Sequence, residues 1–255
     1  MNQRTGMGGT DTRDRALACA AEPGYPAAVV HVAGRLDRDS ASELQACVRD
    51  CLAAEPDVVV LDVADLTVAA DECVPVFAVL SGQAMTWPGS TVVFACAPPD
   101  LLAAVRRTGL DIASYPSVEA ACDRLTAGRS RYRLREALPA SPVAAPVARR
   151  LLGRACRSWS VQEVLEPAEL ITTELVANAV RHAGNRVVLT VSLRHGHLQI
   201  SVGDDSPAPP RPHEATVADE HGRGLLMVEA LCDDWGTTCV RGGKVVWAKV
   251  ATVAT

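Results

Sequence analysis

Apolar and polar positions in the first half of the chain follow two alternating patterns. Short runs rich in valine, alanine and leucine have the length and composition of buried strands. Between them, apolar residues recur every three or four positions, which indicates helices. We expect strands at 28–34, 57–63, 90–96 and near Ile112, and helices at 39–54, 72–85, 98–108 and 118–125. Regular alternation of strand and helix predicts an α/β layer whose sheet is largely covered.

The second half begins with two helical patterns and continues with alternating strands. We expect helices at 143–159, 167–183 and from Gly224 onward, and strands at 186–193, 197–203 and in two final segments ending near Ala251. The stretch 206–222, SPAPPRPHEATVADEHG, is rich in proline and has little periodicity. A long irregular loop inside a compact domain is more often functional than accidental.

The two patterns meet at 126–142, TAGRSRYRLREALPASP, where charge, glycine and two prolines accumulate. We place the domain boundary there, with an N-terminal domain at 13–126 and a C-terminal domain at 137–255. A chain of 255 residues with 48% hydrophobic residues has enough material for two cores.

The net charge of −5 is divided unevenly, because the first half is acidic and the second is mildly basic. This asymmetry argues against a nucleic-acid-binding N-terminal domain and permits docking between the halves or with protein partners, although it also fits a role in solubility alone. We expect no signal peptide, no membrane segment and a cytoplasmic location, since the N-terminus is charged throughout and no apolar run has the length of a membrane span. The nine cysteines form no CxxC pair and are interpreted mainly as reduced core residues. Cys47 and Cys51 share a helix face, but a metal there would need further ligands.

The segment ELITTELVANAVRHA, 169–183, carries the most informative pattern. Glu174, Asn178 and His182 recur at intervals of four, so successive members lie about 40° apart on one helix face. Taken alone, this pattern also fits the solvent face of an amphipathic helix.

Two downstream features favour a functional interpretation. Asp204 follows an apolar strand, where its carboxylate can accept a hydrogen bond from the exocyclic amine of adenine. Gly222 and Gly224 flank Arg223 at a helix start, where glycines let the backbone approach phosphate and unpaired N–H groups attract anions.

Together these features resemble the histidine-kinase-like ATPase superfamily with its Bergerat fold, and especially the anti-sigma-factor serine kinases, over about 138–251. The resemblance implies an α/β sandwich that binds ATP and magnesium. It implies Asn178 as the magnesium ligand, Glu174 as the base and Asp204 as the adenine acceptor. It also implies phosphate contacts at Gly222, Arg223 and Gly224. The chain departs from the DxGxG pattern of the superfamily, because DDSPA, 204–208, stands there.

The N-terminal half resembles the STAS domain of anti-sigma factor antagonists, through AGRLDRDSASEL at 33–44 and the apolar segment 58–80. In antagonists the segment matching 70–73 contains a phosphorylated serine, and that position aligns with Glu72. No serine or threonine occurs from Val68 to Leu80. Glu72 either imitates a phosphoserine, which carries about −1.5 to −2 charges, or favours the start of a helix through the helix dipole.

These features predict a bacterial regulator that phosphorylates an antagonist protein on serine and binds a sigma factor. The first alternative is a nucleotide-gated binding protein without kinase activity. In the second, the STAS half is a scaffold and the ATPase half is a passenger. Homodimerisation is implied by the resemblance alone.

Overall fold

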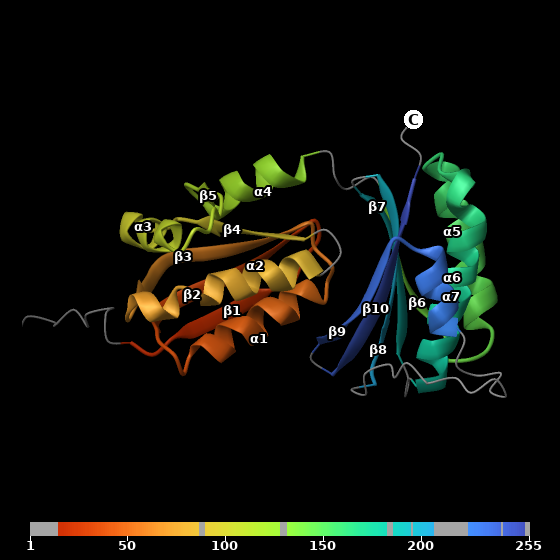
Figure 1. Ribbon diagram of the computed structural model, residues 1–255, viewed down its shortest axis with the longest axis horizontal. Helices are drawn as coiled ribbons and strands as arrows, with labels where there is room; N and C mark the ends of the chain where they lie inside the picture. The colour runs from red at the N-terminus through yellow and green to blue at the C-terminus, as the bar shows by residue number, and fades with distance from the viewer. Residues whose placement is uncertain are drawn as a thin grey trace, which may run out of the picture. The chain divides into compact units, whose positions relative to one another are not determined.

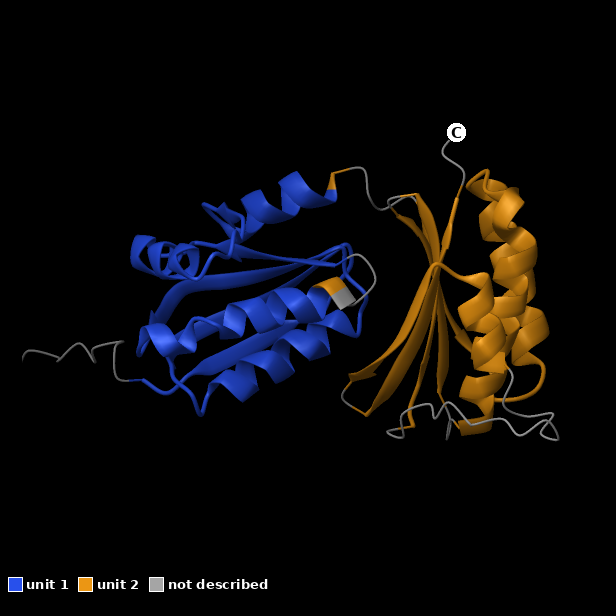
Figure 2. Ribbon diagram, in the orientation of Figure 1, with its two compact units in different colours: residues 1–84, 90–126 blue, residues 85–89, 127–255 orange. Residues whose placement is uncertain are grey.

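The computed structural model describes residues 15–86, 90–127, 132–182, 186–194, 196–206, 224–240 and 242–252. The chain divides into two compact units, 1–84 with 90–126 and 85–89 with 127–255 (Figure 2). Each unit has its own five-stranded sheet. No helix within these described ranges is both long enough and apolar enough to cross a bilayer.

The sheet of the first unit has the strand order β1-β2-β3-β4-β5. Its strands are β1 (Ala18–Glu22), β2 (Ala27–Leu36), β3 (Val58–Val68), β4 (Thr91–Ala95) and β5 (Ser114–Tyr115). Strand β1 is antiparallel to β2, and the other neighbours are parallel. The sequence pattern did not indicate β1, because no residue of this edge strand is fully buried.

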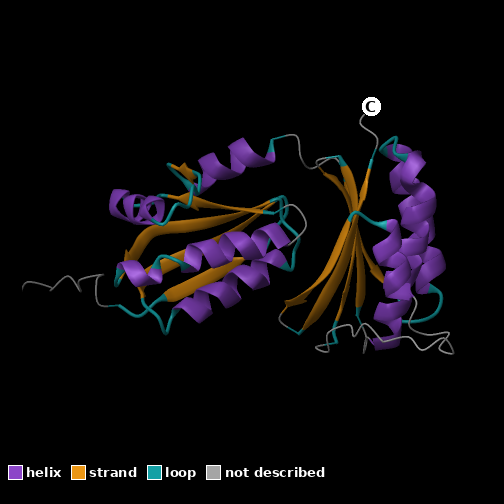
Figure 3. Ribbon diagram, in the orientation of Figure 1, coloured by secondary structure: helices purple, strands orange, loops and turns teal. Residues whose placement is uncertain are grey.

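Helices cover both faces of this sheet (Figure 3). They are α1 (Ala41–Leu52), α2 (Val76–Thr86), α3 (Pro99–Arg107) and α4 (Val118–Thr126). Val93 of β4 packs with Ala121 of α4. The next residue, Phe94, points to the opposite face and meets Phe77 of α2 edge to face, with ring centroids 5.1 Å apart. The strand and helix alternation thus gives the covered α/β layer that the pattern predicts.

The helix expected at 72–85 is interrupted. Residues Asp71–Cys73 form a short 3₁₀ turn, η2, and α2 begins only at Val76. Pro75 lies between them, and proline is tolerated at a helix start but not in its interior, because it lacks an N–H group. Glu72 therefore lies in a separate turn before the helix.

The second unit is an antiparallel sheet with its helices on one side (Figure 1). The strands β6 (Arg133–Leu138), β7 (Val187–Arg194), β8 (His197–Asp204), β9 (Asp234–Val240) and β10 (Gly243–Ala251) lie in the order β6-β7-β8-β10-β9. The helices are α5 (Ala144–Ser158), α6 (Leu165–His182) and α7 (Gly224–Leu231), with a 3₁₀ turn, η4 (Gln162–Val164), before α6. Apolar residues of all three helices and of β6, β7, β8 and β10 form one core.

The segment interpreted as a linker contains an element that the sequence pattern missed. Strand β6 lies within it, begins before the expected domain start at Ala137 and pairs along its whole length with β7. Arg133, Arg135 and Glu136 give this edge strand a polar composition, and only Leu138 is buried. A half-exposed edge strand of this kind has no apolar run to reveal it.

Candidate functional site

Helix α6 positions two of the three residues that recur at intervals of four. Ile171, Leu175 and Ala179 anchor the helix in the core, and Glu174 and Asn178 next to them are half-buried. His182 is the last residue of α6 and is exposed. Glu174 and Asn178 therefore form the protected part of this face.

Glu174 lies against the start of α7. A Cβ at position 224 would lie against Glu174 Oε2, so any residue other than glycine there would displace the flexible Glu174 side chain. The first N–H groups of a helix have no partners within the helix, and carboxylates near them are stabilised by the helix dipole. Gly224 thus has a packing reason in addition to the phosphate contact predicted from the sequence.

Asp204 ends β8 in a buried ion pair. Its Oδ1 lies 2.9 Å from Nζ of Lys244, and both side chains are only 1% exposed. The same oxygen accepts a hydrogen bond of 2.9 Å from the backbone N–H of Ser206. The other oxygen, Oδ2, is buried and has no hydrogen-bond partner among the described residues.

Asn178 also has unused hydrogen-bonding capacity, because its buried Nδ2 has no acceptor within the described ranges. Buried polar groups in native proteins are almost always paired. An unpaired acceptor at Asp204 suits a donor such as the adenine amine. The Asn178 amide suits phosphate oxygens through its N–H and a magnesium ion through its oxygen. These residues fit Mg-ATP. Gly222 and Arg223, predicted to contact phosphate, lie outside the described residues.

In the first unit, Glu72 is exposed in η2 and forms an ion pair with Arg38. Beside it, Arg107 Nη2 donates to both carboxylate oxygens of Asp71, at 3.0 and 3.1 Å. A cleft of about 730 Å³ lies next to this turn, and its charged lining residues are Asp65, Asp71, Asp100 and Arg107. The surroundings of Glu72 thus combine an acidic cleft with two arginine contacts.

Each of the two units matches the model of a known domain family. Residues 138–250 match the model of the histidine kinase-like ATPase domain, and residues 24–118 match a STAS domain model. The chain carries a STAS domain followed by a histidine kinase-like ATPase domain.

Three similar proteins illustrate the extent of the likeness. An uncharacterised Streptomyces coelicolor protein is 36% identical over 69 residues, which are 25% of this chain and 66% of that protein. The RsbU and RsbW domains of a Mycobacterium tuberculosis protein are 22% identical, with a TM-score of 0.38 over 48% of this chain and 33% of that one. An anti-sigma factor antagonist from Mycobacterium paratuberculosis is 21% identical, with a TM-score of 0.37 over 43% of this chain and 94% of that one.

Lys244 is a functional candidate of the ATPase domain that the sequence interpretation missed. It belongs to GGKVVWAKV, in which only a closing strand was recognised. The sequence pattern that could have revealed it is a charged residue in an otherwise apolar alternation. Lys244 is followed at every second position by the buried core residues Val246, Ala248 and Val250. A charged residue at such a position indicates a buried partner.

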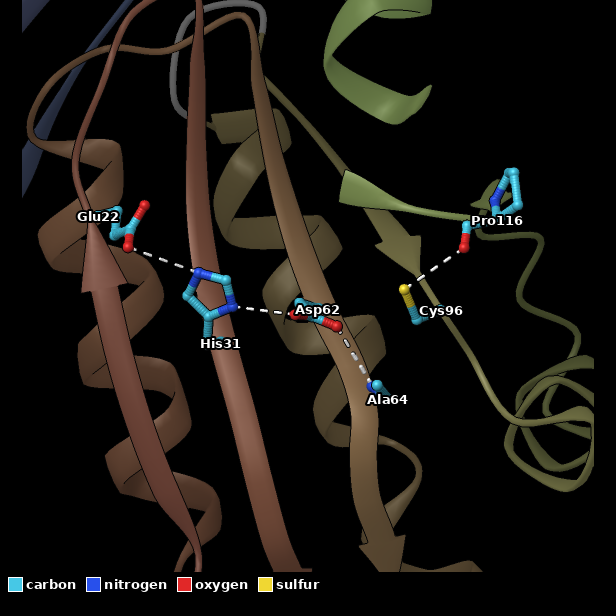
Figure 4. Close-up of polar contacts among 6 residues, drawn as sticks. All are labelled: Glu22, His31, Asp62, Ala64, Cys96 and Pro116. Atoms are coloured by element: carbon cyan, nitrogen blue, oxygen red, sulfur yellow. Dashed lines mark hydrogen bonds and ion pairs between the residues drawn. The ribbon is translucent and has the colours of Figure 1, made fainter. Parts of the chain in front are cut away.

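The STAS domain also contains a polar cluster that runs across neighbouring strands (Figure 4). His31 of β2 lies between Glu22 and Asp62, with Nε2 3.6 Å from Glu22 Oε1 and Nδ1 2.9 Å from Asp62 Oδ2. Burial, together with the nearby carboxylate of Asp62, raises the pKa of the Cys96 thiol. This thiol donates a hydrogen bond to the Pro116 carbonyl at 3.4 Å. In the described part of the chain, no three His, Cys, Asp or Glu residues are placed to hold a metal ion.

Proposed function

We propose that the protein is an ATP-dependent serine kinase of a bacterial partner-switching pathway, which phosphorylates an antagonist protein and binds a sigma factor. The observation that carries this proposal is the buried Asp204 carboxylate, whose Oδ2 has no hydrogen-bond partner among the described residues, in a domain of the histidine kinase-like ATPase type. An unpaired buried acceptor is costly unless a ligand supplies the missing donor. The attached STAS domain supports a partner of the antagonist class.

In this proposal each candidate residue of the ATPase domain has a separate role. Asp204 accepts a hydrogen bond from the adenine amine, and the Asn178 amide orients the phosphates and holds magnesium. Glu174 orients or deprotonates the serine hydroxyl of the partner protein. Bound Mg-ATP supplies the phosphoryl group, and magnesium neutralises charge on its oxygens.

One observation favours a second candidate, a nucleotide-gated binding protein without kinase activity. Glu174 Oε2 lies against the start of α7, where the carboxylate already has a structural role. In this candidate Glu174 couples α6 to α7, and nucleotide binding selects the conformation that binds the partner.

Calorimetry on the full chain tests the nucleotide site. We expect heat on titration of Mg-ATP into the wild type and a loss of the magnesium-dependent part of the affinity in Asn178→Ala. Absence of heat at millimolar nucleotide would contradict the site assignment.

Glu174→Gln separates the two candidates, because it keeps the side-chain volume and removes the base. We expect nearly unchanged Mg-ATP affinity and a loss of phosphoryl transfer to a STAS antagonist by a factor of about 10² to 10⁴. The readout is phosphoserine on the antagonist, measured by mass spectrometry. Transfer at the wild-type rate would show that Glu174 is not the base. Absence of transfer in the wild type, with ATP bound and the cognate antagonist present, would favour the second candidate.

A further inference from the structure

Lys244 lies on the helix-covered face of the sheet together with Asp204. Side chains on a strand alternate between its two faces. Leu198 and Val202 of β8 belong to the core under the helices, so Asp204 lies on that same face. On β10, Val246 belongs to the same core, and Lys244 lies two positions before it and therefore on the same face. Asp204 and Lys244 are also direct partners in the register of β8 and β10.

A close approach of the two strands fixes this pairing. A side chain at position 243 would collide with the backbone carbonyl oxygen of Asp204, so Gly243 lets β10 begin in direct contact with the end of β8. The next residue along β10 is Lys244, whose ammonium group therefore reaches the Asp204 carboxylate. The pair lies at the end of an apolar face, where a single charge without a partner is strongly unfavourable.

The two oxygens of Asp204 have different surroundings. Oδ1 accepts from Lys244 Nζ and from the Ser206 backbone N–H, each at 2.9 Å. Oδ2 has no partner in the described part of the chain. An ionised carboxylate accepts hydrogen bonds and donates none.

We propose that Lys244 is a positioning residue that determines purine specificity, because it occupies Oδ1 of Asp204 and so leaves Oδ2, which has no partner among the described residues, as the acceptor for the base. The inference rests on the proposed function, since it assigns a role within the same nucleotide site. A purine with an amino group at position 6 donates to Oδ2. A purine with an oxo group at that position places a second acceptor against it, and both remain unpaired.

Removal of Lys244 takes away one of the two groups that fix the Asp204 carboxylate. Among the described residues, only the Ser206 N–H then still binds Oδ1. The acceptor for the 6-amino group is held less firmly, so the preference for a 6-amino purine weakens.

The test compares ATP with inosine triphosphate, which carries an oxo group in place of the 6-amino group. Calorimetry is performed on the full chain with magnesium, in the wild type, Lys244→Met and Lys249→Met. Lys249 is the matched control, because it lies on the opposite face of β10 and pairs with Asp234 at 3.1 Å. We expect the wild type and Lys249→Met to prefer ATP by about tenfold or more, the factor of one hydrogen bond. In Lys244→Met this ratio falls by about tenfold, to near one.

Circular dichroism establishes that each variant is folded. If Lys244→Met does not fold, Lys244→Gln replaces it. Glutamine is polar but shorter and uncharged, so it holds Oδ1 less firmly and the ratio falls here as well. A wild-type ratio in the Lys244 variant, even with both affinities reduced, overturns the inference and leaves the proposed function standing. Equal affinity of the wild type for ATP and inosine triphosphate also overturns the inference and leaves the proposed function standing. A wild type that binds neither nucleotide overturns the proposed function and the inference together.

Discussion

At the residue scale, close contacts explain two glycines of the ATPase domain better than turn geometry does. A side chain at position 224 would meet Glu174 Oε2, and one at position 243 would meet the Asp204 backbone oxygen. In contrast, apart from the backbone of its own helix, no heavy atom of the described residues lies within 4 Å of the place where Gly82 would carry a Cβ. Replacement of Gly224 should therefore move a neighbouring side chain, whereas replacement of Gly82 should move none.

We predict that Gly224→Ala lowers phosphoryl transfer to the antagonist, because the added methyl group displaces the Glu174 carboxylate. The free energy of unfolding of the ATPase domain changes by less than about 1 kcal/mol, since the flexible Glu174 side chain can move aside. The matched change Gly82→Ala, inside α2 of the STAS domain, raises the stability of that domain by about 0.5–1 kcal/mol through helix propensity. Phosphoserine on the antagonist and urea unfolding followed by circular dichroism measure the two effects. Wild-type transfer by Gly224→Ala would contradict the contact with Glu174.

At the element scale, β6 completes the sheet of the ATPase domain from within the segment that the sequence suggested as a linker. It pairs with β7 from Arg133↔Ser192 to Leu138↔Val187, and it buries Leu138 in the core. Without β6, β7 would become the edge of the sheet with unpaired backbone groups. The element therefore belongs to the ATPase domain.

We predict that a fragment of residues 127–255 is more stable than one of residues 139–255. The difference in unfolding free energy is at least about 1.5–3 kcal/mol, the contribution of one fully buried leucine side chain. The shorter fragment also aggregates more readily, because it exposes the edge of β7. Chemical denaturation and light scattering of the two fragments measure these effects. Equal stability would show that β6 is dispensable.

At the scale of the whole molecule, one chain combines a STAS domain with an ATPase domain of the type proposed here to phosphorylate STAS proteins. By the resemblance to antagonists, Glu72 stands at the position of their phosphorylated serine, and its exposed carboxylate pairs with Arg38. No serine or threonine occurs between Val68 and Leu80. The STAS domain therefore lacks an acceptor in this segment, and we propose that it regulates the kinase instead of serving as its substrate.

We predict that Glu72→Ser creates an acceptor that becomes phosphorylated in the presence of Mg-ATP, within one molecule or between two. Arg38 then pairs with the phosphate as it pairs with Glu72, because arginine binds both groups in the same geometry. Glu72→Ala is the control and remains unmodified at this position. Phosphopeptide mass spectrometry is the readout, and phosphate on Thr67 or Ser81 of the wild type would contradict the regulatory role.

Local patterns in the sequence were enough to predict much of the fold and the shared helix face of Glu174 and Asn178. The spacing of Glu174 and Asn178 places them on one helix face, because helical periodicity depends only on neighbouring residues. Apolar runs located strands β2, β3 and β4 and the core strands of the ATPase domain for the same reason. Strands β1 and β6 escaped prediction because edge strands carry few buried residues.

The sequence by itself determined which residues share a helix or strand face, and through that the α/β class, the order of most elements and the shared face of the candidate residues on α6. Only the tertiary structure decided which faces meet. Lys244 and Asp204 are 40 positions apart, and the pairing of β8 with β10 brings them within 2.9 Å. Likewise, the packing of α7 on α6 sets Gly224 against Glu174. Strand pairing and helix packing join residues far apart in the chain, and no local periodicity encodes those contacts.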